Sequence, residues 1–167
     1  LEIFQHHFSE MGHGDLLVTQ IYLSGKATTP PSASRVASAA RAASFKRLYD
    51  PIDAADRVSC RPDFAVIVYP GYLAIAEQNF AANADIHPTE QTPPSFIVQA
   101  EDDPVHVENS TVYFLELKNA KVPAELHVYA QGGHGYGLRR TELPVTTWPQ
   151  LVETWLHTIQ VLPSAAR

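Results

Sequence analysis

The chain has 167 residues, enough for one domain, and 45% of them are hydrophobic, so it can bury a core. Its 12 basic and 18 acidic residues give a formal net charge of -6 without any block of like charge, which argues against a nucleic-acid partner. No apolar stretch approaches the ~20 residues that span a bilayer, and no secretory signal is visible at the start, so we expect no membrane partner. Cys60 is the only cysteine, which excludes an intrachain disulfide and a cysteine-rich zinc site and leaves the cellular compartment undecided.

The first quarter of the chain differs in composition from the rest. Residues 15–25, DLLVTQIYLSG, contain enough Leu, Val, Ile and Tyr for a strand that ends at Gly25. Residues 26–45, KATTPPSASRVASAARAASF, are rich in Ala, Ser, Thr and Pro, which indicates a loop followed by a weak helix, or a poorly ordered segment. We therefore divide the chain into an atypical N-terminal segment, residues 1–44, and a regular portion, residues 45–167.

Three short apolar runs predict strands in the regular portion. They are AVIVYPG at 65–71, SFIVQAEDD at 95–103 and AELHVYA at 124–130. The first two are short apolar runs typical of strands that are buried on both faces of a parallel sheet, and the third is a further strand that leads into a glycine-rich loop.

Two helices are predicted from apolar periodicity. Residues 107–121 combine good helix formers with Val112, Phe114, Leu115 and Leu117, after a polar start that suits capping. Strands that alternate with helices in this order predict an α/β fold, with a parallel sheet and helices on its faces.

The second predicted helix lies near the end of the chain. Thr147 and Gln150 have the spacing of a capping box at its start. The residues of its predicted buried face are Trp148, Leu151, Val152, Trp155 and Ile159. The two tryptophans are therefore interpreted as core residues.

Ionisable side chains follow two of the predicted strands. Asp102 and Asp103 end the run at 95–103, and His134 lies beyond the run at 124–130, inside the glycine-rich stretch QGGHGYG. Functional residues of open parallel sheets gather beyond the carboxyl ends of the strands. A carboxylate there can accept a hydrogen bond from one imidazole nitrogen, so that the other nitrogen acts as a base.

These stretches resemble a known family. PPSFIVQAEDDPVHVENS, followed by VPAELHVYAQGGHGYGLR, is similar to the C-terminal part of α/β-hydrolase esterases of the acetylxylan-esterase, feruloyl-esterase and dienelactone-hydrolase-like kind. DAADRVSCRPDFAVIVYPGYL at 53–73 resembles the segment that precedes the acid strand in that group. The resemblance, which covers roughly residues 45–162, implies the C-terminal half of a hydrolase sheet of about eight strands, with a triad in the order Ser, Asp, His.

The resemblance also implies which residues form the triad. The acid of such sequences stands three positions before a valine, which selects Asp102 ahead of Val105 and leaves Asp103 as the alternative register. The base is His134. The nucleophile aligns with Ser32, in PPSAS, although no G-x-S-x-G occurs in the sequence. Ser24, directly after a predicted strand, is the alternative nucleophile.

The implied function is serine carboxylic-ester hydrolysis, with acetylated or feruloylated plant polysaccharide as the substrate class and small peptide or lipid esters as alternatives. Such a triad requires no cofactor or metal. The sequence also lacks the HGGG-type oxyanion loop of the family. A truncated or inactive form, or a non-catalytic α/β-hydrolase-like domain, therefore remains the competing hypothesis, whereas a nucleotide-binding protein is disfavoured because no phosphate-binding glycine motif follows a strand.

Other histidines are given structural interpretations. The N-terminal group HHFSEMGH matches no metalloprotease spacing, so we interpret it as a solvent-facing segment and not as a metal site. His127 alternates with apolar residues on a predicted strand and is expected to be structural. His106 is placed beside the site without a role.

The chain is expected to associate with itself. Half of a hydrolase sheet would expose an unpaired parallel edge, and such edges pair with other chains. We therefore predict that the purified chain dimerises or aggregates through this edge. Sedimentation measurements test this, and a well-behaved monomer at micromolar concentration would contradict it.

Overall fold

The computed structural model describes residues 21–23, 52 and 63–163. Its main sheet consists of β1 (Ile21–Leu23), β2 (Ala65–Val68), β5 (Ser95–Ala100) and β6 (Ala124–Tyr129). The strands are ordered β1-β2-β5-β6, and every pairing is parallel. The predicted strands and their parallel arrangement are therefore confirmed, while the proposed boundary after residue 44 lies outside the described residues.

The central strands are buried because nearly all of their side chains are apolar, with Ser95 and Gln99 of β5 as buried polar exceptions. Every residue of β2 and of β5 is buried. Ala65 lies opposite Ser95, which lies opposite Ala124, so β2, β5 and β6 start at the same level. The loops that leave their carboxyl ends therefore emerge side by side.

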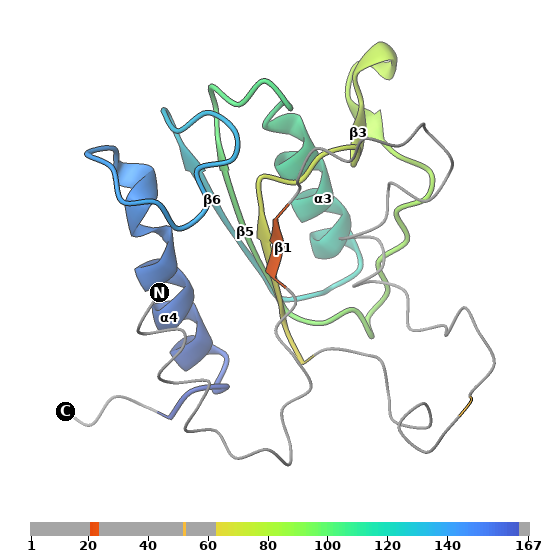
Figure 1. The fold of residues 1–167 in the computed structure, drawn as a ribbon. Coiled ribbons are helices and arrows are strands. Elements are labelled where there is room, and N and C mark those ends of the chain that lie inside the picture. Colours follow the sequence, from red (N-terminus) through yellow and green to blue (C-terminus); the bar gives the residue numbers. More distant parts are fainter. Residues whose placement is uncertain (1–20, 24–51, 53–62, 164–167) are drawn as a thin grey trace.

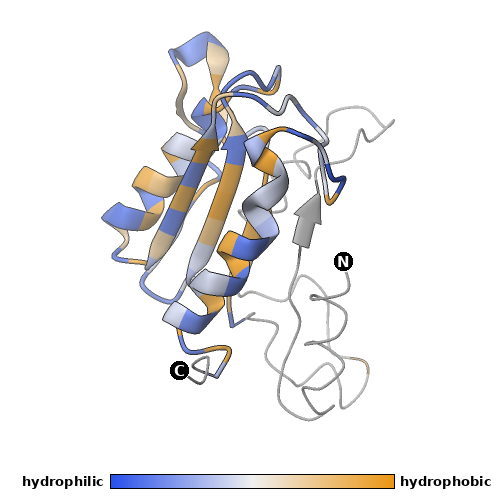
Figure 2. Cartoon of the chain, turned by 90° about the vertical axis from the view of Figure 1, so that its left-hand side faces the viewer, coloured by the Kyte–Doolittle hydropathy of each residue, from blue (hydrophilic) through white to orange (hydrophobic). Residues whose placement is uncertain are grey.

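The two long helices cover opposite faces of this sheet (Figure 1). The first, α3 (Glu108–Asn119), packs with Tyr113 and Leu117 against Ile67 and Ile97. The second, α4 (Trp148–Thr158), belongs to the other cluster, whose buried members include Val66, Phe96, Val98, Trp148, Val152 and Trp155. In Figure 2 the hydrophobic colouring follows the strands and the sheet-facing sides of the helices, as expected for a core between layers.

The apolar residues of α3 are not all buried. Leu115 is 52% exposed, whereas Tyr113 is fully buried. Asn109 and Ser110, in the first turn, are also buried. The helix therefore presents polar side chains to the sheet at the end where the loop after β5 enters it.

The predicted capping box of α4 is wrong. A 3-10 turn, η3 (Pro144–Thr147), leads directly into the helix, so Thr147 already has helical backbone angles and makes no side-chain cap. Its hydroxyl donates to the carbonyl of Pro144 at 2.8 Å instead. The predicted burial of Trp148 and Trp155 is confirmed.

A small hairpin that the sequence analysis did not predict follows β2. It comprises β3 (Ala74–Ile75), the 3-10 turn η2 (Ala76–Gln78) and β4 (Ala81–Ala82), with β3 and β4 antiparallel. Its turn uses Asn79 and Phe80 with positive φ angles of 52° and 57°.

Asn109 connects this hairpin to the loop after β5. Its Oδ1 accepts from the backbone amides of Leu73 at 2.7 Å and Ala74 at 3.0 Å. Its Nδ2 donates to the carbonyls of Val105 at 2.5 Å and His106 at 2.9 Å. One buried amide therefore satisfies backbone groups of both segments.

Among the described residues, no helix is both long enough and apolar enough to cross a membrane.

Two leucines of α3 give a matched test of the core. Leu117 is fully buried and Leu115 is 52% exposed on the same helix. Leu117→Ala should lower the free energy of unfolding by about 2–5 kcal/mol, because it removes buried methyl groups and leaves a cavity. Leu115→Ala should change it by less than about 0.5 kcal/mol. Urea unfolding compares the two variants, and equal losses would contradict this packing of α3.

Candidate active site

The site residues leave three neighbouring strands at their carboxyl ends. Tyr69 follows β2, Asp102 and Asp103 follow β5, and His134 follows β6. Parallel pairing places all these ends at one edge of the sheet, where functional residues of such sheets gather.

His134 is hydrogen-bonded to Asp103. Its Nδ1 lies 3.0 Å from both carboxylate oxygens. The Asp103 side chain has no exposed surface, whereas that of His134 is 26% exposed. Since a carboxylate only accepts hydrogen bonds, Nδ1 carries the proton. A neutral ring in this tautomer has its basic lone pair on Nε2.

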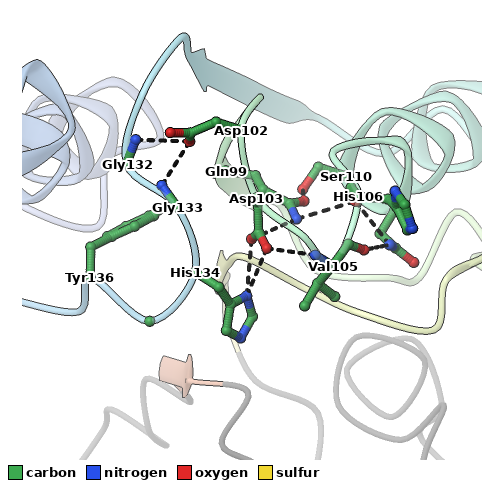
Figure 3. A network of polar contacts seen from close by, with 12 residues as sticks. Gln99, Asp102, Asp103, Val105, His106, Ser110, Gly132, Gly133, His134 and Tyr136 are labelled. Atoms are coloured by element: carbon green, nitrogen blue, oxygen red, sulfur yellow. Dashed lines mark hydrogen bonds and ion pairs between the residues drawn. The ribbon is translucent and has the colours of Figure 1, made fainter.

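The selection of Asp102 as the partner of His134 was wrong, and the alternative register, Asp103, makes the contact (Figure 3). Asp102 turns the other way, and its Oδ1 accepts from the backbone amides of Gly132 at 2.9 Å and Gly133 at 2.7 Å. The two neighbouring aspartates therefore have separate tasks. Asp103 holds the imidazole, and Asp102 holds the loop that carries it.

The turn after β5 separates the two carboxylates. The amide of Asp103 donates back to the carbonyl of Ala100 at 3.3 Å, so the strand ends in a tight turn. Asp103 Oδ1 then accepts from the amide of Val105, two residues on, at 2.8 Å. This local bond fixes the Asp103 side chain facing inward.

The glycines position the histidine loop. Gly133 and Gly135, on either side of His134, have φ angles of 60° and 76°, which residues with a Cβ adopt at a cost. At Gly132, a Cβ would lie 3.0 Å from the Ala100 Cβ and 3.2 Å from the Val145 side chain. The loop therefore crosses the end of β5 closely and turns sharply around His134.

Arg139 and Trp148 hold the far side of this loop. Arg139 donates from its guanidinium to the carbonyls of Gly135 and Tyr136. The indole Nε1 of Trp148 donates to the carbonyl of Gly137 at 2.9 Å. Backbone groups after His134 are thus tied both locally and to α4.

Tyr69 packs against the imidazole, and Tyr136 packs against Tyr69. The Tyr69 ring lies 4.7 Å from that of His134, tilted by 60°, and meets Tyr136 edge-on at 4.8 Å. Burial raises the pKa of Tyr69 above its ordinary value, and the nearby Arg139 and the Gly137 backbone oppose this shift. Burial also raises the pKa of Tyr136, whose hydroxyl donates to the Val98 carbonyl at 3.3 Å. Both rings are therefore neutral at physiological pH.

The other residues that were singled out in the sequence lie outside the described residues or have other side-chain partners. Ser32, Ser24 and the N-terminal group His6, His7, Glu10 and His13 lie outside the described residues. His106 is exposed, with a φ of 70°, and its ring meets Phe80 of the hairpin edge-on at 5.3 Å.

His127 has the structural setting that was predicted. Its ring stacks on Phe96 at 4.9 Å, and its Nε2 lies 2.6 Å from Glu125. No group of three metal-ligating side chains occurs within the described ranges.

Tyr69 and Gln99 were not predicted as site residues from the sequence. Gln99 contacts Asp103 and is fully buried within β5. A signal for it was present, because Gln99 is the one polar residue inside the apolar run FIVQA. Tyr69 gave no comparable signal, since an aromatic residue at a strand end is ordinary.

The chain matches the prolyl oligopeptidase family over residues 58–156, which is more than half of its length. The comparison with curated proteins gives no significant match.

The solved structures that are similar to this chain include an acetyl ester-xyloside bifunctional hydrolase from Caldicellulosiruptor lactoaceticus. It is 32% identical with a TM-score of 0.63, and the match covers 77% of this chain and 54% of that one. Esterase Est2 from Thermogutta terrifontis is 16% identical with a TM-score of 0.56, covering 77% and 53% of the two chains. MGS-M1, an α/β hydrolase from a Medee basin deep-sea metagenome library, is 24% identical with a TM-score of 0.53, covering 64% and 47%.

This chain therefore spans about half the length of the structures that it matches. The two less similar structures support the fold alone. The predicted α/β-hydrolase fold, as part of the larger fold of these proteins, is confirmed, and so is the resemblance to the esterases of that superfamily.

The separate task of Asp102 can be tested by hydrogen exchange. Asp102→Ala should raise the exchange rates of the Gly132 and Gly133 amides roughly tenfold, because both lose a charged acceptor. Asp102→Asn keeps an oxygen at this position and should restore most of the protection. Amide exchange followed by NMR measures this, and unchanged protection in Asp102→Ala would contradict the role of the carboxylate.

Proposed function

This chain belongs to the prolyl oligopeptidase family, and from that premise we propose that it carries the base and the acid of a serine carboxylic-ester hydrolase. His134 is the base and Asp103 is the acid. The observation that carries the proposal is the buried pairing of these two side chains at the carboxyl edge of a parallel sheet, with Nδ1 3.0 Å from the carboxylate.

In the proposed reaction, a serine hydroxyl attacks the acyl carbonyl while Nε2 of His134 takes its proton. The imidazolium then returns this proton to the leaving alkoxide as the ester C–O bond breaks. Water, activated in the same way, hydrolyses the acyl-enzyme. Asp103 keeps Nε2 available for these transfers and stabilises the cation, because Nδ1–H remains bonded to it throughout.

The nucleophile is proposed from the sequence and the strand order. β1 lies parallel to β2, with Leu23 opposite Val68, so the chain leaves β1 at the same edge of the sheet as the acid and histidine loops. Ser24 is the next residue in the sequence, and Ser32 is the serine that aligns with the family motif. Ser32 is the nucleophile that we propose, and Ser24 is the alternative.

Acetyl esters of plant carbohydrate are the proposed substrate class. The support is the 32% identity to a protein named as an acetyl ester-xyloside bifunctional hydrolase. Feruloyl, peptide and lipid esters are the alternatives that direct assay separates.

One observation favours a second function. No G-x-S-x-G occurs in the sequence, and α/β-hydrolases use this turn to present their serine. The competing proposal is therefore a non-catalytic α/β-hydrolase-like domain that retains the acid and base pair without a working nucleophile.

A fluorophosphonate probe separates these two proposals. The hydrolase proposal predicts an adduct on Ser32, found by peptide mapping, that is lost in His134→Ala. An adduct on Ser24 would replace Ser32 as the nucleophile. Absence of any serine adduct, under conditions that label a control esterase, would support the non-catalytic domain.

Matched amide variants test the acid. Asp103→Asn should lower kcat towards p-nitrophenyl acetate about 10⁴-fold, because an amide removes the charge that stabilises the imidazolium and favours the wrong tautomer. Asp102→Asn should lower it less than about tenfold, since it keeps an acceptor for the loop amides. A larger loss of kcat in Asp102→Asn than in Asp103→Asn would identify Asp102 as the acid instead.

A further inference from the structure

Gln99 is a buried polar side chain in an apolar environment. It has no exposed surface, and it lies on the α3 face of β5, two residues after the fully buried Ile97. A buried amide is costly unless its donors and acceptor are all used. Its partners therefore indicate why glutamine is placed there.

Every polar group of the Gln99 amide has a partner. Oε1 accepts from the Ser110 hydroxyl at 2.6 Å. Nε2 donates to Asp103 Oδ2 at 3.0 Å and to the carbonyl of His106 at 3.2 Å. Ser110, in the first turn of α3, is itself fully buried (Figure 3).

The chemistry of these partners fixes the orientation of the amide. If the amide were rotated by half a turn, Oε1 would face the Asp103 carboxylate and the His106 carbonyl, neither of which can donate. In the observed orientation, the Ser110 hydroxyl supplies the donor that Oε1 needs. Ser110 and the two acceptors therefore hold Nε2 towards Asp103.

The Asp103 carboxylate is thereby held by three donors. Oδ1 accepts from the Val105 amide, Oδ2 accepts from Gln99, and both oxygens lie 3.0 Å from Nδ1 of His134. The Val105 bond alone would leave the carboxylate able to turn about its Cβ–Cγ bond. The second donor, on the other oxygen, fixes the plane of the carboxylate beneath the imidazole.

We propose that Gln99, oriented by Ser110, is the positioning residue that fixes the Asp103 carboxylate and so holds His134 in its Nδ1–H tautomer. The consequence for catalysis rests on the proposed function, whereas the consequence for the tautomer does not. Gln99 itself touches no reacting atom, and it acts through Asp103.

Three variants and a control test this positioning role. Gln99→Met removes the donor at nearly constant volume, and Ser110→Ala leaves Gln99 in place but releases its amide. Gln99→Glu keeps the shape and introduces a group that donates to Asp103 when protonated and repels it when ionised. Ile97→Val, on the same face of β5, perturbs the core without touching Asp103.

The first readout needs no activity. ¹⁵N NMR of the His134 ring at pH 8 reports its tautomer, and the Nδ1 proton reports exchange with water. Gln99→Met should lower the Nδ1–H population and speed this exchange roughly 10- to 100-fold, the range expected for loss of a hydrogen bond to a charged group. Ser110→Ala should give a smaller change in the same direction. Ile97→Val should give neither.

The second readout is ester hydrolysis. Gln99→Met should lower kcat by a similar factor with little change in KM, because substrate contacts are intact. Gln99→Glu should show a new descending limb in its kcat–pH profile, since the introduced carboxyl ionises against Asp103 as the pH rises. A role confined to packing would produce neither the KM and kcat split nor this limb.

The outcomes separate the two proposals. If the wild-type chain is inactive but the tautomer contrast appears, the hydrolase proposal fails and the positioning role stands. If Gln99→Met and Ser110→Ala leave the tautomer and the Nδ1 exchange as in Ile97→Val, the positioning role is overturned, whether or not the chain is active. Should Gln99→Met fail to fold, Ser110→Ala decides by the same criterion.

Discussion

The arrangement at the carboxyl edge of the sheet depends on one buried negative charge. Asp103 is removed from water, and an ionised carboxylate in such a place is stable only when it is paired and hydrogen-bonded. His134, the Val105 amide and Gln99 supply these partners from three different segments. Because each segment must be in place for the carboxylate to be satisfied, the contacts of Asp103 constrain the ends of β5 and β6 and the loop that leads into α3 together.

The histidine loop meets this requirement from the other side. Its glycines allow a close crossing over β5 and a sharp turn around His134. A backbone with so much freedom would lose entropy on ordering, and its order comes from polar contacts that lie outside the imidazole. Asp102, Arg139 and Trp148 each bind backbone groups of this loop. The imidazole is therefore carried on a segment that is fixed at several points, which is the condition for preorganised chemistry.

The sheet could be predicted from the sequence because its signal is local. Runs such as AVIV and FIV are apolar on both faces, and this property favours burial. The choice between Asp102 and Asp103 was not predictable in this way. Adjacent carboxylates have identical chemistry, and their directions are set by the turn after Ala100 and by contacts with residues 30 or 31 positions away. The β3–β4 hairpin was missed for a related reason, since its strands are only two residues long and carry no periodicity.

Asn109 couples the position of the β3–β4 hairpin to that of the loop after β5. Its single amide group binds the backbone at the start of β3 through Oδ1 and the backbone beyond Asp103 through Nδ2. A rigid planar group of this kind transmits displacement, because neither side can shift without breaking bonds on the other. Loop grafting at residues 76–80 should therefore leave the geometry of the His134–Asp103 contact intact only if Leu73 and Ala74 keep their places. Asn109 therefore ties the start of the hairpin to the loop that carries Asp103.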